Sequence, residues 1–175
     1  MGQELGLFFE KNAIIPAFVP IDTTGAAVVG DYINMRDIDR IVAVILMGAW
    51  AGGTPAVTFN QATSAAGAGA KGLPFNHYYH GVALTTDRMT KVAATNPGLS
   101  TATFNLAATL NKFYAVEIRA EDMDTNGGFN YAGIAIASPG ANADLIAGFY
   151  ILPNLRYPQG WPTVGAVGGP PTAIV

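Results

Sequence analysis

The sequence contains no cysteine and few charged residues. Without cysteine the chain can form no disulfide, no thiolate metal site and no cysteine nucleophile. Lys, Arg, Asp and Glu make up 12% of the residues, against about 25% in an ordinary soluble domain. A chain of 175 residues cannot cover its surface with so few charges. Apolar and small neutral side chains must therefore reach the surface, as they do where proteins meet.

Basic clusters and long apolar runs are also missing. The net charge is −3 and the few Lys and Arg residues form no patch, although nucleic-acid binding requires a basic face. The longest apolar run, residues 41–50, is IVAVILMGAW, whereas a membrane-spanning helix needs about twenty residues. The N-terminus, MGQELGLFFEKN, lacks the basic start of a secretory signal. We therefore expect neither a nucleic-acid nor a membrane partner.

Glycine and proline are frequent. The 21 Gly and 11 Pro separate short apolar segments, and no segment carries a long helical stripe. This spacing predicts a single all-β domain, a two-sheet β-sandwich or a jelly roll. The expected strands are residues 17–21, 31–36, 40–47, 56–62, 73–80, 88–94, 101–106, 112–119, 130–137 and 145–152. A short helix over residues 106–111 is an alternative to part of this pattern.

The expected strands show two kinds of pattern. In residues 112–119, Tyr114, Val116 and Ile118 share one face, while the opposite face carries Glu117 and Arg119. Such alternation is typical of a half-solvated strand. Residues 40–47 and 145–152 are instead apolar on both faces. These two strands are expected in the centre of a sheet, or covered on the outside by another subunit.

Both ends of the chain differ from the middle. Residues 153–175 are rich in Pro and Gly, which disfavours a helix or central strand, yet they are too apolar for a solvated linker. We expect an extended C-terminal arm there and an N-terminal arm over residues 1–16, leaving 17–152 as the sandwich domain. The large apolar side chains of the arms are the candidate interface residues: Phe8, Phe9, Leu155, Tyr157, Trp161 and Ile174.

Two motifs resemble ligand sites. GAGAKG, residues 67–72, looks like half of a phosphate-binding loop, but Lys71 is followed by neither the required hydroxyl nor a helix. We expect a loop without anchoring side chains. In EDMDTNGG, Asp122, Asp124 and Asn126 match the first calcium ligands of an EF-hand, although the twelfth position is Gly133. They form a weak calcium candidate, and ordinary turn residues are the alternative.

Catalytic residues are hard to assemble from this sequence. The only histidines, His77 and His80, are three apart on an expected strand and point to opposite faces, so they cannot jointly chelate a metal. No nucleophile motif is present. We expect no enzymatic activity and no cofactor. A sugar-stacking platform of Tyr78, Tyr79, Tyr157 and Trp161 is an alternative to a role of these aromatic residues in protein interfaces.

One long pattern resembles a known group of proteins. It comprises IDTTGAAVVGDYINMRDIDRIVAVILMGAWAG, then PAVTFNQATSAAGAGAKGL, then YAVEIRAEDMDTNGGFNYAGIAIASPGANADLIAGFYILPNLRYP, within residues 21–158. This succession resembles small virion proteins of tailed bacteriophages, usually found among head genes. The pattern contains no chemical signature, so no binding residue is carried over.

The resemblance implies a head decoration or cement protein. Such a protein assembles in the bacterial cytoplasm, sits on the capsid exterior as a homo-oligomer, dimer or trimer, and binds the major capsid protein or other virion subunits. Other virion roles are alternatives: a head-completion, neck, tail or fibre-associated β-domain. A carbohydrate-binding β-sandwich module is a third possibility.

Overall fold

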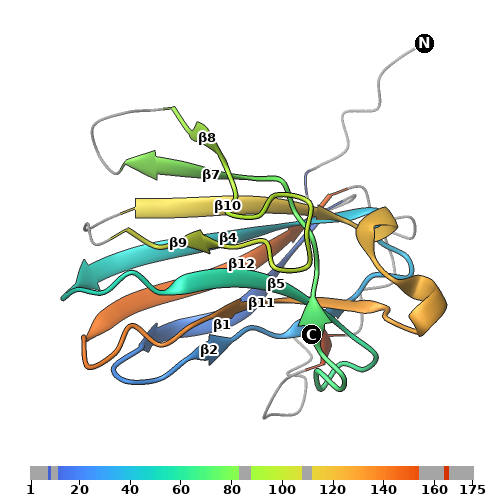
Figure 1. Ribbon diagram of the computed structural model, residues 1–175, viewed down its shortest axis with the longest axis horizontal. Helices are drawn as coiled ribbons and strands as arrows, with labels where there is room; N and C mark the ends of the chain where they lie inside the picture. Colours follow the sequence, from blue (N-terminus) through green and yellow to red (C-terminus); the bar gives the residue numbers. More distant parts are fainter. Residues whose placement is uncertain (1–7, 9–11, 83–87, 108–111, 154–163, 166–175) are drawn as a thin grey trace.

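The computed structural model describes residues 8, 12–82, 88–107, 112–153 and 164–165. Two antiparallel β-sheets form the fold, and Figure 1 shows them as two layers, one behind the other. The predicted all-β sandwich is therefore confirmed. The six-stranded sheet has the order β1 (Ala13–Asp22), β12 (Asp144–Leu152), β4 (Arg40–Trp50), β10 (Lys112–Arg119), β7 (His77–Val82) and β8 (Thr90–Ala93).

The seven-stranded sheet is made of shorter strands. Its order is β13 (Val164–Gly165), β3 (Tyr32–Asn34), β11 (Tyr131–Ile136), β5 (Ala56–Ala62) and β6 (Lys71–Gly72), while β2 (Val28–Val29) pairs with β11 and β9 (Phe104–Asn105) pairs with β5. Consecutive strands β3, β4 and β5 alternate between the sheets, and β1 pairs with β12. The jelly roll, a finer description than a sandwich, stays a prediction.

The core lies between the two sheets. In β10, Tyr114, Val116 and Ile118 are buried, so the face expected to be apolar is the inner face. Aromatic rings join the layers: the ring of Tyr78 stacks on that of Phe104, with 4.5 Å between centroids. The apolar inner faces of both sheets thus hold the sandwich together through burial of hydrophobic surface.

Several expected boundaries are wrong. β1 begins at Ala13, which is 1% exposed and pairs with Leu152, so residues 13–16 belong to the sheet and not to an N-terminal arm. β7 begins at His77, although the expected strand begins at residue 73. Leu73 and Phe75 belong to an irregular segment, yet their side chains are buried in the core. The N–H of Leu73 donates to Phe59 O of β5 and so holds this segment against the sheet.

Apart from the single helical residue Phe8, helical structure in the described ranges consists of two short 3-10 turns. They are η1 (Ala120–Asp122) and η2 (Thr125–Gly127), directly after β10. Residues 106–107 are not helical, and the remainder of the alternative helix, 108–111, lies outside the described residues. No helix in the described parts of the chain has the length and apolar character needed to cross a bilayer.

Candidate functional site: the outer face of the six-stranded sheet

The six-stranded sheet carries apolar side chains on both faces. In β4, Ile41, Ala43 and Ile45 point into the core, so Val42 and Val44 point outward. Directly opposite residues of paired strands share a face, and the register places Phe149 of β12 and Ala115 of β10 beside Val44. The same reasoning assigns the rest of this outer surface. We call it the apolar face: Ile14, Pro16, Val42, Val44, Leu46, Phe113, Ala115, Leu145, Ala147, Phe149 and Ile151.

The apolar face is in contact with solvent. Ile14 is 41% exposed, Leu46 45% and Leu145 47%, while the other aliphatic and aromatic side chains of the face are half-buried among their neighbours. The outer face of an antiparallel sheet is ordinarily polar, because water covers it. None of the residues of the apolar face is charged. A contiguous apolar surface of this kind is a candidate for contact with another molecule or segment.

Charged residues begin where the apolar face ends. Glu117 of β10 lies directly opposite Val42, and Arg40 is the next outward position of β4; Arg40 Nη1 and Glu117 Oε1 are 3.1 Å apart. At the other end of the face, Asp22 of β1 lies opposite Leu145. Arg119, paired in register with Arg40, bonds to Glu121 over 2.8 Å. These ion pairs are exposed and contribute little to stability. In each pair the positive and negative charges neutralise one another at the border of the apolar face.

The outer face of the seven-stranded sheet has a different character. Thr58, Asn60 and Tyr131 point outward there, opposite to the buried Val57 and Phe59. Tyr32 also lies on this side: a Cβ built on Gly133 would stand 3.1 Å from its ring. The outward positions of this face thus include the neutral polar Thr58 and Asn60, but also Val29 of β2, which pairs with Ala135 and is 47% exposed. This face is more polar than the apolar face but not free of apolar side chains.

The loop over residues 63–70 folds back onto the seven-stranded sheet. Thr63 Oγ1 donates to Ala68 O over 3.1 Å, and Ser64 Oγ accepts from Ala68 N over 3.2 Å. Gly67 lies against the ring of Tyr32, where a Cβ would stand 2.8 Å from Cε2. The expectation that this loop lacks anchoring side chains is therefore wrong. Lys71, the last recognisable part of the phosphate-loop pattern, is a residue of β6.

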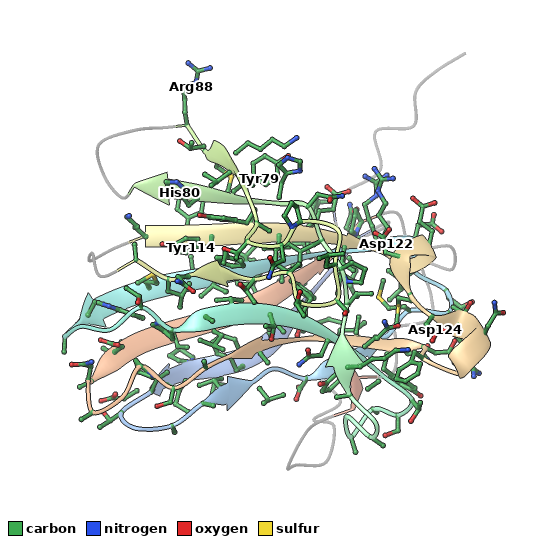
Figure 2. All side chains as sticks on the ribbon, in the orientation of Figure 1. Tyr79, His80, Arg88, Tyr114, Asp122 and Asp124 are labelled. Carbon is green, nitrogen blue, oxygen red and sulfur yellow. The ribbon has the colours of Figure 1, made fainter. Side chains whose placement is uncertain are left out.

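The calcium candidate is not assembled. Asp124 Oδ2 lies 2.6 Å from Lys71 Nζ, and its Oδ1 accepts from Gly127 N over 2.9 Å. The hydrogen bond from Lys71 holds the pKa of Asp124 below its usual range. Asp122 lies on the other turn, η1, apart from Asp124 (Figure 2). Asn126 is an exposed residue of η2. Among the residues the structure describes, no three His, Asp or Glu side chains come together as metal ligands.

A polar cleft lies beyond the apolar face, on the β7 and β8 side. It has a volume of about 450 Å³, and its lining includes Asn76, His77, Tyr79, Lys91, Glu117 and Asp122. The lining carries charges of both signs. Tyr79 is the part of the expected sugar-stacking platform found here, since Tyr78 points inward onto Phe104, and Tyr157 and Trp161 lie outside the described residues.

The two histidines lie on opposite faces of β7, as expected. His77 lines the polar cleft, whereas His80 lies inside, with its ring centroid 6.0 Å from that of Tyr114 (Figure 2). Nδ1 of His80 is buried without a hydrogen-bond partner in the described part of the molecule. The geometry therefore keeps the two imidazoles from sharing a ligand.

Of the six expected interface residues, the structure describes only Phe8. Phe8 is 50% exposed, whereas Phe9, Leu155, Tyr157, Trp161 and Ile174 lie outside the described residues. From the sequence we expect β4 and β12 to be central or covered by another subunit, but the candidate interface residues named from it are all in the two arms and none is on the apolar face. Both strands are central, as expected, and their second apolar face forms the middle of this surface.

Comparison of the chain with models of protein families, with curated proteins and with solved structures finds no match.

Proposed function

We propose that this protein is a non-enzymatic structural component of a virion, a decoration or cement protein that binds and stabilises the capsid lattice of a tailed bacteriophage. The observation that carries a structural role is the apolar face, a sheet surface without charge that faces water. The pattern in residues 21–158 supports the capsid as the place of assembly. The protein would then bind to the capsid exterior, and contacts through the apolar face would remove this face from water.

The physical basis of this role is burial of the apolar face. Each 100 Å² of apolar surface removed from water contributes roughly 2.5 kcal/mol. The loss of translational and rotational freedom on association opposes this gain by about 4–15 kcal/mol. A subunit held in a lattice by several neighbours has already lost much of that freedom. Contacts through this face therefore stabilise an assembly more effectively than they stabilise an isolated pair.

The test is co-sedimentation with capsids that lack the protein, comparing the wild type with Leu46→Asp and Thr58→Asp. Leu46 lies on the apolar face, whereas Thr58 lies on the outer face of the other sheet, so both variants add the same charge at solvent-facing strand positions. We expect the wild type and Thr58→Asp to bind and Leu46→Asp to be lost from the pellet. Full binding of a folded Leu46→Asp variant would contradict a role for the face.

The amount bound separates the virion roles. A decoration protein follows the capsid lattice and is present in proportion to the capsid subunits, whereas a neck, head-completion or tail part is present in far fewer copies. A gel of purified particles, with this band quantified against the major capsid protein, measures the ratio. Far fewer copies than capsid subunits would favour the alternative virion component.

The polar cleft favours a second candidate, a carbohydrate-binding module. Tyr79 offers a ring for stacking, while Asn76, Lys91 and Asp122 offer donors and acceptors to hydroxyl groups. A glycan array with Tyr79→Ala tests it, with Tyr131→Ala as the control because Tyr131 lies on the other sheet. Glycan binding that Tyr79→Ala abolishes and Tyr131→Ala retains would favour this function over a purely structural one.

A further inference from the structure

We propose that the apolar face packs against the same face of a second copy, so that the protein is a two-fold symmetric dimer in solution. This deepens the proposed function, because it names the molecule that covers the face. The contact is sheet on sheet, the arrangement that already joins the two layers within each copy. Three observations favour a second copy: the protected sheet edges, the distribution of charge and the size of the face.

The sheet edges are protected against strand addition. β1, one edge of the six-stranded sheet, contains Pro16 and Pro20, and its pairing with β12 shifts register twice, between Pro16 and Phe18 and between Phe18 and Ile21. Proline and bulges block an incoming strand. The opposite edge, β8, spans only Thr90–Ala93. A second copy can therefore pack against the face of this sheet, but it finds no long, regular edge strand with which to pair.

The charge distribution permits a face to meet its own copy. In a two-fold contact both copies use the same surface. A face that carries charges of one sign would therefore meet like charges on the partner and be repelled. The side chains of the apolar face carry no charge, and the charged residues beside it are Glu117, which is opposite Val42 and ion-paired with Arg40, and Asp22, which is opposite Leu145 on the edge strand β1. These charges lie at the margin of the face, so two copies that meet through its centre leave them in water and avoid the cost of burying an unpaired charge.

The size of the face suits a modest dimer. The strands β1, β12, β4 and β10 at a spacing of about 4.8 Å give a width of about 20 Å including side chains. Residues 145–151 span about 23 Å along β12 at 3.3 Å per residue. The contact then buries roughly 460 Å² on each copy, or about 900 Å² in total, which is below the roughly 1,200 Å² of stable specific interfaces and in the range of weak, transient ones. We therefore expect a dimer that forms at micromolar concentration and dissociates on dilution.

Sedimentation equilibrium of the full chain over a range of concentrations tests the dimer. We compare the wild type with Leu46→Glu, Leu145→Glu and the control Thr58→Glu. Leu46 and Leu145 are nearly half exposed, so in the monomer a glutamate at either position stays hydrated and the fold is kept. Thermal unfolding of each variant verifies this. We expect concentration-dependent dimers for the wild type and Thr58→Glu, and at least tenfold weaker dimerisation for both leucine variants.

Other results overturn the inference in distinguishable ways. A wild type that is monomeric at every concentration excludes the second copy. If capsid binding is still lost in Leu46→Asp, a capsid protein covers the face, and the proposed function stands without the dimer. A dimer or trimer that the leucine variants leave intact uses another surface. Dimers that form while no capsid binding occurs support this inference and contradict the proposed function.

Discussion

The hydroxyl of Tyr150 in the six-stranded sheet accepts a hydrogen bond from the backbone N–H of Ile134 in the other sheet, over 3.0 Å. Gly30 makes this contact sterically possible, because a Cβ there would stand 2.9 Å from the hydroxyl and from Ile134 Cγ2. Gly30 N donates in turn to Ile134 O over 2.8 Å. This polar contact thus links the two layers inside an apolar core.

Replacing Tyr150 by Phe should destabilise the fold by about 1–3 kcal/mol, because the buried N–H of Ile134 loses its acceptor. Denaturation in urea measures the change. Tyr79→Phe is the control, since Tyr79 lines the polar cleft and should tolerate the loss of its hydroxyl. Equal stability of Tyr150→Phe and the wild type would show that the inter-sheet hydrogen bond contributes nothing.

Alkaline pH should unfold the protein through its buried tyrosines. Burial raises the pKa of Tyr150, Tyr32 and Tyr114 above the usual value of about 10. The folded state therefore keeps protons that the unfolded state releases, and the stability present below about pH 10 is lost as the pH rises further. Each tyrosine contributes a slope of up to about 1.4 kcal/mol per pH unit.

The variant Tyr150→Phe isolates one of these contributions. Its free energy of unfolding should fall less steeply than that of the wild type between about pH 10 and pH 12. Urea denaturation at several pH values measures both slopes. Identical slopes would mean that Tyr150 ionises equally in the folded and unfolded states.

Gly72 should not tolerate a side chain. A Cβ at this residue of β6 would stand 1.7 Å from the backbone oxygen of Ser100, so Gly72→Ala must displace one backbone segment. We expect a loss of about 1–3 kcal/mol, as for an overpacked core. Gly48→Ala is the matched control, because its Cβ would meet Leu145 at an acceptable 3.4 Å. Melting temperatures of the two variants measure the difference. Equal stability of Gly72→Ala and Gly48→Ala would contradict the prediction.

Calcium should leave the melting temperature unchanged. Both carboxylate oxygens of Asp124 already have partners, Lys71 Nζ and Gly127 N, and Asp122 faces the polar cleft. Differential scanning calorimetry with calcium or with a chelator checks this. A rise in melting temperature with calcium that is absent in Asp122→Asn would show instead that the turn binds the ion.

The sequence predicts some strands well because their patterns are strict. Residues 56–62 and 112–119 match β5 and β10 end to end, since buried apolar residues recur at every second position and polar residues such as Thr58, Asn60, Glu117 and Arg119 lie between or beyond them. β7 is misplaced by the apolar Leu73 and Phe75, which fill the core without belonging to a strand. An irregular segment that packs in the core has the same composition as a strand, so periodicity does not separate them.

The apolar face illustrates what periodicity leaves out. The double-sided apolar pattern of β4 and β12 correctly predicts central strands. It does not say that these strands are neighbours, nor that Phe113 and Ile14 extend their outer surface on either side. Such information depends on pairing between residues far apart in the chain, for example Val44 with Phe149. The pattern of residues within one strand does not predict which distant strand pairs with it.

The lack of charge on the apolar face determines which conditions control assembly. Contacts between charged surfaces weaken when salt screens them, whereas burial of uncharged apolar surface is insensitive to simple screening. Hydrophobic association loses strength on cooling, because its driving force near room temperature is entropic. An assembly held by this face would therefore loosen in the cold and tighten on warming, with temperature, and not ionic strength, as its natural control.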